Sequence, residues 1–316
     1  METVAISCRA LTKTYADVRA LDALDLEVPR GSLFGFLGPN GAGKTTVMRL
    51  LLGLIRPTSG TAHVLGHDVV TDSLAVRHRV GYLPQQPLFP SELTARQVLR
   101  YARGFFSRDR DARVEDDIDA ALDLVGLTEK AESRAGALSG GQLQRLGIAQ
   151  AQIHRPALLI LDEPAAALDP LGRRDVLEVM RRLQHTATVF YSTHILDDVQ
   201  QVSDEVAILN SGRRLLQAPM QEVLRSQAGP AYELTLTGDV AAALAALRAQ
   251  SWVSAVTSAG DEETGCLLSV QVNDTDAARR QLLRLVLGED VAVDSFGPRT
   301  TELEDVFIDL VEGSSR

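Results

Sequence analysis

A glycine-rich segment, GPNGAGKTT, has the residue types and the spacing that bind phosphate groups. It follows the pattern G-x-x-x-x-G-K-[ST] and stands between an apolar run, LFGFL, and a helical pattern. Backbone N–H groups of such a loop surround phosphate oxygens, and the N-terminus of the next helix adds positive potential. A glycine-rich turn that only begins a helix is the alternative, and the flanking pattern disfavours it. The predicted phosphate-binding residues are Gly38, Pro39, Asn40, Gly41, Ala42, Gly43, Lys44, Thr45 and Thr46.

A pair of acids ends a second apolar run, ALLILDEP. In a chain with a phosphate loop, Lys44 is expected to contact the β- and γ-phosphates, while Thr45 and Asp162 hold Mg²⁺ and its water shell. Glu163 is then expected to orient or deprotonate the attacking water. Solvated acids at a strand end are the alternative for this segment on its own. The phosphate loop in the same chain favours the catalytic interpretation.

The stretch ALSGGQLQRLGIAQAQIHRP begins with two glycines that an ordinary helix does not need. Ser139 is a good N-cap, and Pro156 ends the helical pattern. A glycine costs about 1 kcal/mol relative to alanine inside a helix. The glycines therefore indicate that another group approaches the backbone at this point, whereas a bare N-cap is the alternative.

The segment LSGGQ, after a phosphate loop and before LLILDEP, resembles the signature of ATP-binding cassette (ABC) proteins. The resemblance covers roughly residues 3 to 217. In that family two cassettes pair head to tail, and the signature of one cassette caps the γ-phosphate held by the other. The resemblance implies that the residues making this contact in trans are Ser139, Gly140, Gly141 and Gln142.

Other positions match the family one by one. Gln85 in GYLPQQP matches the loop glutamine that senses Mg²⁺ and the membrane partner, with the adjacent Gln86 as the alternative. Asp169 in AALDP matches the loop that crosses the dimer interface. Ala166 and Ala167 stand where the family more often has Ser-Gly, which removes a hydroxyl contact and bears on the coupling between the two sites.

Two further matches concern the nucleotide itself. His194 ends the segment TVFYSTH and matches the switch histidine that contacts the γ-phosphate. Tyr15 matches the aromatic residue that stacks on adenine, and a half-buried tyrosine at a strand end is the alternative. Next to Gln85, Leu88 and Phe89 form an apolar loop tip that would either receive a helix of a membrane subunit or be buried in its own domain.

An α/β core must position these residues. Dense apolar runs such as ALLILD, TVFYS and EVAIL predict parallel strands buried on both faces, and residues 91–135 read as a charged helical insertion. The resemblance implies a P-loop NTPase cassette with a RecA-like core, an antiparallel β subdomain and a helical subdomain at about residues 88–150. After residue 217 the pattern is strand, helix, strand, strand, helix, strand, which predicts a small α+β, ferredoxin-like domain. The predicted domains are 1–217 and 218–316, with a connection near Gly229–Pro230.

The composition excludes several classes of protein. With 316 residues, 45% of them hydrophobic and 23% charged, the chain can bury a globular core. A net charge of −10 argues against a nucleic-acid partner. The distant Cys8 and Cys266 predict neither zinc nor a disulfide framework, and they fit a reducing compartment. The sequence shows no signal peptide, and its apolar runs are too short to span a membrane.

These observations predict an ATP-hydrolysing subunit, with ATP and Mg²⁺ as ligands, that drives a separate integral-membrane permease. A homodimer of such chains would hold two intact sites at the cytoplasmic face of the cell membrane. The C-terminal extension, which ends in LEDVFIDL, looks like the ATPase subunits of bacterial drug and antibiotic exporters with ABC-2-type permeases. Exporters of lipid, polysaccharide or ions are alternatives. Three alternatives come from other classes of protein. They are a soluble ABC protein acting on ribosomes or DNA, an ordinary P-loop kinase or GTPase, and a subunit without turnover.

Overall fold

The computed structural model describes residues 3–106, 113–166, 168–226, 231–238, 240–261, 265–287 and 291–298, together with 303–304, 306–307 and 310. The chain divides into two compact units, Met1–Met220 and Gln221–Arg316. Each unit has its own sheets and its own core, so each is described by itself.

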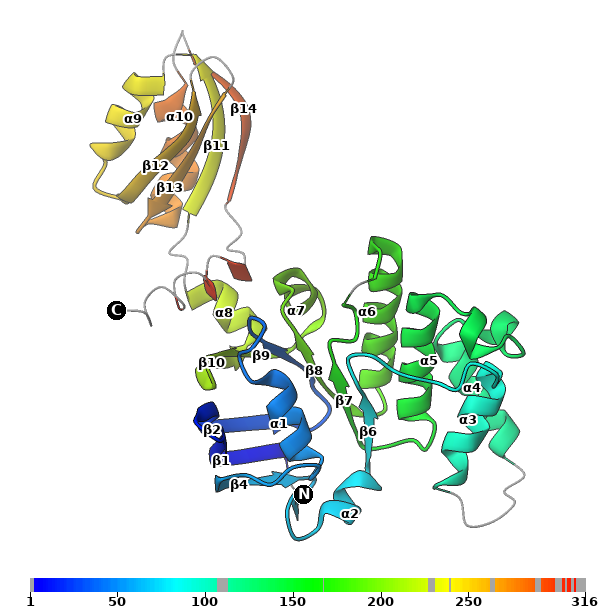
Figure 1. The fold of residues 1–316 in the computed structure, drawn as a ribbon. Coiled ribbons are helices and arrows are strands. Elements are labelled where there is room, and N and C mark those ends of the chain that lie inside the picture. Colours follow the sequence, from blue (N-terminus) through cyan, green and yellow to red (C-terminus); the bar gives the residue numbers. More distant parts are fainter. Residues whose placement is uncertain are drawn as a thin grey trace. The chain divides into compact units, whose positions relative to one another are not determined.

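The first unit contains an antiparallel sheet and a mostly parallel sheet (Figure 1). The antiparallel sheet has the order β2-β1-β4-β5 and is built from β1 (Val4–Tyr15), β2 (Val18–Pro29), β4 (Ser59–Val64) and β5 (His67–Asp68). The other sheet has the order β10-β9-β3-β8-β7-β6. Its strands are β3 (Leu33–Leu37), β6 (Val80–Leu83), β7 (Leu158–Asp162), β8 (Thr188–Thr193), β9 (Glu205–Asn210) and β10 (Arg213–Pro219).

The parallel strands of the larger sheet bring distant segments of the chain to one edge. β3 pairs in parallel with β8, β8 pairs in parallel with β7, and only β10 runs antiparallel. Every residue of β3, β7 and β8 is buried, as expected for strands covered on both faces. The carboxyl ends of these three strands therefore meet, and ligands of open α/β sheets bind beyond such ends.

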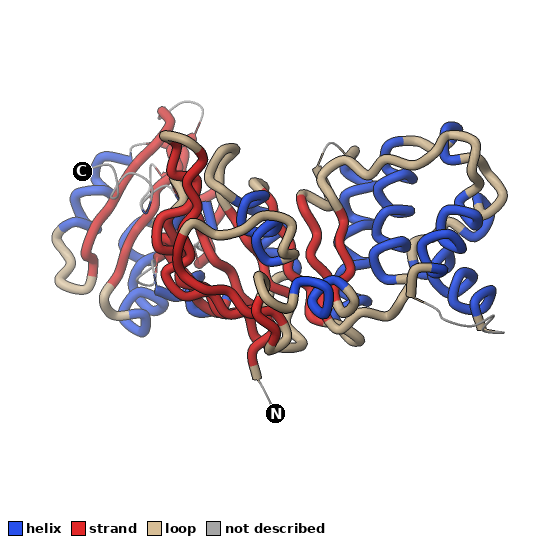
Figure 2. The backbone as a smooth tube through the Cα atoms, turned by 60° about the horizontal axis from the view of Figure 1, so that its bottom comes forward, coloured by secondary structure: helices blue, strands red, loops and turns tan. Residues whose placement is uncertain are grey.

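Some helices pack against this sheet, and others form a separate group beside it. In the first unit they are α1 (Lys44–Leu51), α2 (Ser73–Arg77), α3 (Ala95–Gly104), α4 (Val114–Leu124), α5 (Gly140–Gln152), α6 (Pro170–Gln184) and α7 (Leu196–Val202). Helix α8 (Met220–Ser226) begins at the last residue of the first unit and continues into the second. Helices α3, α4 and α5 contact one another. Figure 2 shows a group of helices set to one side of the strands. Two short 3-10 helices, Thr128–Lys130 and Ala135–Ala137, lead into α5.

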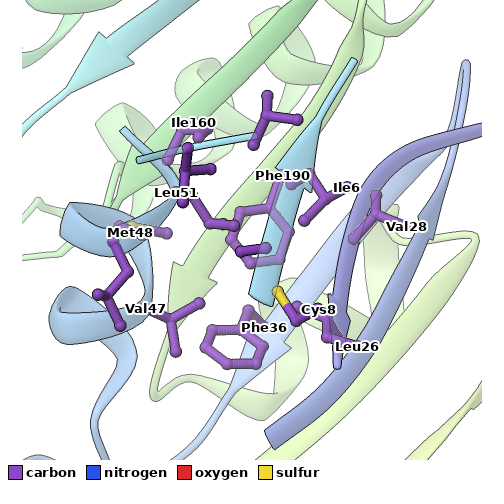
Figure 3. Packing of buried hydrophobic residues seen from close by; sticks show 14 of the residues in the cluster. Ile6, Cys8, Leu26, Val28, Phe36, Val47, Met48, Leu51, Ile160 and Phe190 are labelled. Carbon is purple, nitrogen blue, oxygen red and sulfur yellow. The ribbon is translucent and has the colours of Figure 1, made fainter. Parts of the chain in front are cut away.

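The core of the first unit fixes α1 between the two sheets. Val47, Met48 and Leu51 of α1 are fully buried and belong to one cluster with residues of both sheets. Figure 3 shows these side chains meeting Phe36 and Phe190 of the larger sheet. Burying side chains of this size contributes about 1.5–3 kcal/mol each. The helix that follows the phosphate loop is therefore held firmly on both sides.

The second unit is a four-stranded antiparallel sheet with two helices. Its elements are β11 (Ala231–Gly238), α9 (Val240–Arg248), β12 (Val253–Asp261), β13 (Gly265–Val272), α10 (Thr275–Val286) and β14 (Val291–Pro298). The strand order is β12-β13-β11-β14, and Leu234, Leu268 and Leu282 lie in a core shared by the sheet and the helices. The chain order is strand, helix, strand, strand, helix, strand. Gly229–Pro230 lies outside the described residues, and β10 continues two residues beyond the expected end at residue 217.

Candidate active site

The predicted phosphate loop joins the end of β3 to the start of α1. Gly43 begins the helix with φ 109° and ψ 3°, a left-handed conformation that favours glycine. A Cβ at Gly38 would lie 2.3 Å from the carbonyl oxygen of Leu209, so no side chain fits there without moving backbone. Above the loop lies a pocket of about 250 Å³. Its lining residues are Ala20, Pro39, Asn40, Gly41, Ala42, Gly43, Lys44, Thr45, Thr46, Gln85 and Glu163.

The Lys44 ammonium group is buried at the base of this pocket. Nζ donates to the carbonyl oxygen of Gly38 at 2.6 Å and to that of Pro39 at 3.3 Å. It also lies 3.2 Å from Oε1 of Glu163. Lys44 and Glu163 are 7% and 4% exposed, so their charges face each other with little water between them.

The two acids follow each other at the end of β7, and one hydroxyl group contacts both. Oγ of Ser192 on β8 donates to Oδ1 of Asp162 at 2.6 Å and accepts from the backbone N–H of Glu163 at 3.0 Å. Asp162 and Ser192 are register partners in the parallel ladder. Sequence reasoning missed Ser192. A hydroxyl residue inside an apolar, fully buried strand is the signal that could have found it.

Glu163 is held in a conformation that few residues adopt. Its φ is +51°, in the left-handed region, and such strain at a non-glycine residue costs of order 1–3 kcal/mol. Nδ1 of His194 lies 2.9 Å from Oε2 of Glu163. An ionised carboxylate only accepts hydrogen bonds, so the His194 tautomer with the proton on Nδ1 is the one that fits this contact. The structure thus brings Lys44, Glu163 and His194 into one group.

Of the other predicted residues, some line the phosphate pocket and others lie outside it. Gln85 lines the phosphate pocket, and Gln86 is not among the lining residues. Tyr15 is 42% exposed beneath Nζ of Lys13, which lies 4.8 Å from its ring centroid, and it is not among the lining residues either. Asp169 caps α6, since its Oδ1 accepts from the N–H of Gly172 at 2.9 Å. Ala167 lies outside the described residues.

The LSGGQ segment forms a complete N-cap on α5. Oγ of Ser139 accepts from the N–H of Gln142 at 3.3 Å, and Oε1 of Gln142 accepts from the N–H of Ser139 at 2.9 Å. These reciprocal bonds form a capping box. A Cβ at Gly140 would meet nothing within 4 Å, and one at Gly141 would only touch Leu168 at 3.5 Å. The fold of the single chain does not require either glycine.

Comparison with known proteins identifies the family. A model described as ABC transporter matches residues 21–166. YxlF, an uncharacterized ABC transporter ATP-binding protein of Bacillus subtilis, is 37% identical over 306 residues, which are 97% of this chain and 99% of the relative. The chain belongs to the ATP-binding subunits of ABC transporters. This ABC subunit binds ATP and is an ATPase, as its family is.

Two further comparisons cover different shares of this ABC subunit. The daunorubicin resistance ATP-binding protein DrrA3 of Streptomyces coeruleorubidus is 34% identical over 320 residues, covering 100% of this chain and 98% of the relative. The solved structure of cbiO1 from Clostridium perfringens, described as part of an ABC transporter complex, has a TM-score of 0.65 and 27% identity. It covers 72% of this chain and 92% of that one. Across the described residues of the ABC subunit, no helix is long and apolar enough to cross a membrane.

Proposed function

We propose that two copies of this chain bind ATP between them and drive a separate membrane permease that exports drugs, antibiotics or similar amphipathic compounds. The site of action would be the cytoplasmic face of the cell membrane. The daunorubicin resistance relative supports this class because it aligns over the whole chain, including the second unit. We interpret residues 1–217 as the nucleotide-binding domain and residues 218–316 as a ferredoxin-like accessory domain. Export of lipid, polysaccharide or ions is the alternative.

The single observation that carries the pairing of two copies is the open backbone of the LSGGQ segment. Gly140 has free space where a side chain would stand, and the residues lining the phosphate pocket include none of Ser139–Gln142. The glycines thus serve neither the packing of this chain nor its own pocket. Backbone N–H groups at a helix N-terminus attract anions, and the absence of side chains lets an anion approach closely. A γ-phosphate held by a second copy fits this requirement.

The residues at the end of β7 fit a bound Mg²⁺. Oδ2 of Asp162 is buried and has no hydrogen-bond partner among the described residues. Mg²⁺ prefers oxygen ligands and keeps several waters, so one carboxylate, one hydroxyl and phosphate oxygens suffice to hold it. We assign Thr45 and Asp162 to this ion, with Gln85 at the rim of the pocket. The ion would neutralise charge that develops on the phosphate oxygens.

The catalytic step follows from the group around Glu163. Lys44 would hold the β- and γ-phosphates, and Glu163 would accept a proton from the water that attacks the γ-phosphorus in line. His194 would keep Glu163 oriented through the bond from Nδ1 to Oε2, which is 2.9 Å long. The P–O bond to ADP then breaks, and phosphate leaves with the oxygen of the water. Tyr15 is assigned to adenine and Asp169 to the contact with the second copy.

An apolar groove beside Gln85 supports a membrane-subunit partner. It has a volume of about 440 Å³ and is lined in part by Pro84, Tyr101 and Phe105. Tyr101 is 67% exposed and Phe105 is 65% exposed, which is unusual for large apolar side chains. Leu88, in the segment after Gln85, is 91% exposed. We assign this surface to an amphipathic segment of the permease, whose apolar face would cover these rings.

ATP-dependent association tests the pairing. The Glu163→Gln chain, in which hydrolysis is blocked, is mixed with ATP and its mass is measured in solution. We expect a dimer with ATP and a monomer when Ser139→Arg is added, because the long cationic side chain would occupy the phosphate approach. Lys130→Ala, on the exposed 3-10 helix Thr128–Lys130, is the control and should still pair. Pairing of the Ser139→Arg variant would overturn the proposal. Co-purification from membranes, followed by transport assays in vesicles, would identify the permease.

A further inference from the structure

We propose that Arg173 and Asp198 are positioning residues that keep His194 bonded to Glu163. They would do so by joining helix α6, whose N-cap is Asp169, to helix α7, which begins two residues after His194. A displacement of Asp169 would therefore move the catalytic group through this pair. This last step rests on the proposed contact of Asp169 with a second copy.

The contacts on α6 form a short chain of bonds. Asp169 caps the helix through the N–H of Gly172, and its carbonyl oxygen accepts from the N–H of Arg173 at 2.9 Å. The side chain of Arg173, one turn into the helix, donates from Nε to Oδ1 of Asp198 at 2.5 Å. A movement of the helix start therefore displaces the guanidinium group that holds α7.

The carboxylate of Asp198 is almost fully buried. The residue is 1% exposed, and its Oδ2 has no hydrogen-bond partner among the described residues. Burial raises the pKa of Asp198, and the neighbouring Arg173 lowers it. The negative charges of Asp197 and Glu163 also raise the pKa of Asp198. Arg173 compensates the charge of this buried carboxylate, and loss of Arg173 would leave a buried charge without compensation.

Helix α7 depends on side-chain contacts for its orientation. It has seven residues, and Ile195 at its N-cap offers no side-chain cap. Isolated helices of this length are marginal, so tertiary contacts decide where the helix lies. The hydroxyl of Tyr191 on β8 donates to the carbonyl oxygen of Asp198 at 3.4 Å and lies 2.8 Å from Oγ of Ser203. On the α6 side, Arg181 also donates to the carbonyl oxygen of Gln201, but both of these residues are exposed.

These contacts make the Arg173–Asp198 pair a partly buried ionic link between the two helices. His194 precedes α7 by two residues, and its ring is 45% exposed, so the ring itself has little packing around it. Small rotations of α7 change the distance from Nδ1 of His194 to Oε2 of Glu163. A displacement of about 1 Å at a catalytic group can lower the rate about 100-fold.

The experiment compares Arg173→Met, Asp198→Asn, the double variant and Arg173→Lys in the full chain. For each we measure kcat and KM for ATP, ATP binding and the melting temperature. We expect the first two variants to lower kcat by about 10-fold or more while KM changes less than about 3-fold, which is the pattern of a lost transition-state interaction. The double variant should be no worse than either single variant, because the two side chains act as a unit. Arg173→Lys keeps the charge and should recover most of kcat. Glu178→Gln, an exposed residue on the same helix, is the control.

Two outcomes would overturn the inference. One is a kcat within about 2-fold of the parent chain in folded Asp198→Asn, which keeps the side-chain shape. The other is a loss confined to ATP binding or to melting temperature, because a purely structural role would act there. If Arg173→Met does not fold, the kcat of Asp198→Asn decides the test. If the parent chain hydrolyses ATP without pairing, the proposed pairing fails, whereas an unchanged kcat in chains that do pair refutes only the link between α6 and α7.

Discussion

Nζ of Lys44 lies 3.2 Å from Oε1 of Glu163, and both side chains are buried. The lysine assigned to the phosphates is thus also the ionic partner of the proposed general base. Phosphate oxygens and this carboxylate compete for the same ammonium group. Binding of ATP would draw Lys44 toward the phosphates and leave Glu163 bonded to His194, with one carboxylate oxygen available for water.

Replacement of Glu163 by Gln is expected to preserve ATP binding and to lower turnover by about 10²–10⁴-fold, because the amide cannot accept the proton of the attacking water. ATP affinity should hold or rise, since Lys44 loses a competing negative charge. Phosphate release and equilibrium nucleotide binding measure the two effects. Glu129→Gln, at an exposed position, serves as the control and should behave like the parent chain. Turnover at the parent rate in Glu163→Gln would show that another group activates the water.

Gly38→Ala is expected to abolish most ATP binding. The new Cβ would lie 2.3 Å from the carbonyl oxygen of Leu209, so the loop or β9 must shift. Gly104→Ala, at the end of α3, meets nothing within 4 Å and is the matched control. Nucleotide titration followed by a fluorescent ATP analogue compares the two variants. Parent-like affinity in Gly38→Ala would mean that the loop accommodates a side chain.

Phe190→Ala is expected to destabilise the first unit by about 3–5 kcal/mol, because it leaves a cavity in a dense core. The Phe190 ring is fully buried, with centroids 5.8 Å from Phe34 and 5.3 Å from Phe36. Leu88→Ala removes a side chain that is 91% exposed and should change stability by less than about 0.5 kcal/mol. Denaturant unfolding of the full chain measures both. Equal effects of the two substitutions would contradict this description of the core.

The stability of the first unit is expected to fall as the pH drops from about 6.5 toward 4, in part because of His154. Burial lowers the pKa of His154 from 6.5 to about 4, and the charges of Arg103 and His78 act in the same direction. Between these two values the unfolded chain binds a proton that the folded chain excludes, so unfolding is favoured as the pH falls. His154 also stacks on Phe106 with ring centroids 3.8 Å apart.

His154→Gln should therefore lose less stability across this pH range than the parent chain does. Melting temperatures at pH 7, 6, 5 and 4 give the comparison. His185→Gln, on the exposed end of α6, controls for the loss of a histidine. Carboxylates titrate in all three chains, so only the difference between variants is informative. Parallel pH profiles for His154→Gln and the parent would show that His154 is not the group responsible.

Much of the fold follows from the sequence because the strongest signals are local. The burial of β7 and β8 follows from their continuous apolar residues, and the start of α5 follows from Ser139. The phosphate loop is predicted by its spacing together with the strand and helix patterns on either side. The apolar run ALLILDEP likewise predicts a buried strand that ends at the two acids. These features depend on residues close together in the chain.

The remaining features depend on contacts between distant residues. The bonds from Ser192 to the acids require the register of β8 against β7, and strands buried along their whole length show no alternation that could set it. The Arg173–Asp198 pair joins two helices whose charged residues look like ordinary solvated surface in the sequence. The left-handed φ of Glu163 has no local signal either, since Glu rarely adopts it.

The hydroxyl of Ser192 has a consequence for how such chains can change over time. Because one atom on β8 contacts the carboxylate of Asp162 and the backbone N–H of Glu163, hydrogen bonds to the neighbouring strand fix the place of the two acids at the end of β7. Substitutions that leave Ser192 and the pairing of β7 with β8 intact would therefore keep the two acids in place. Related chains can in this way differ elsewhere and still keep the placement of these two acids.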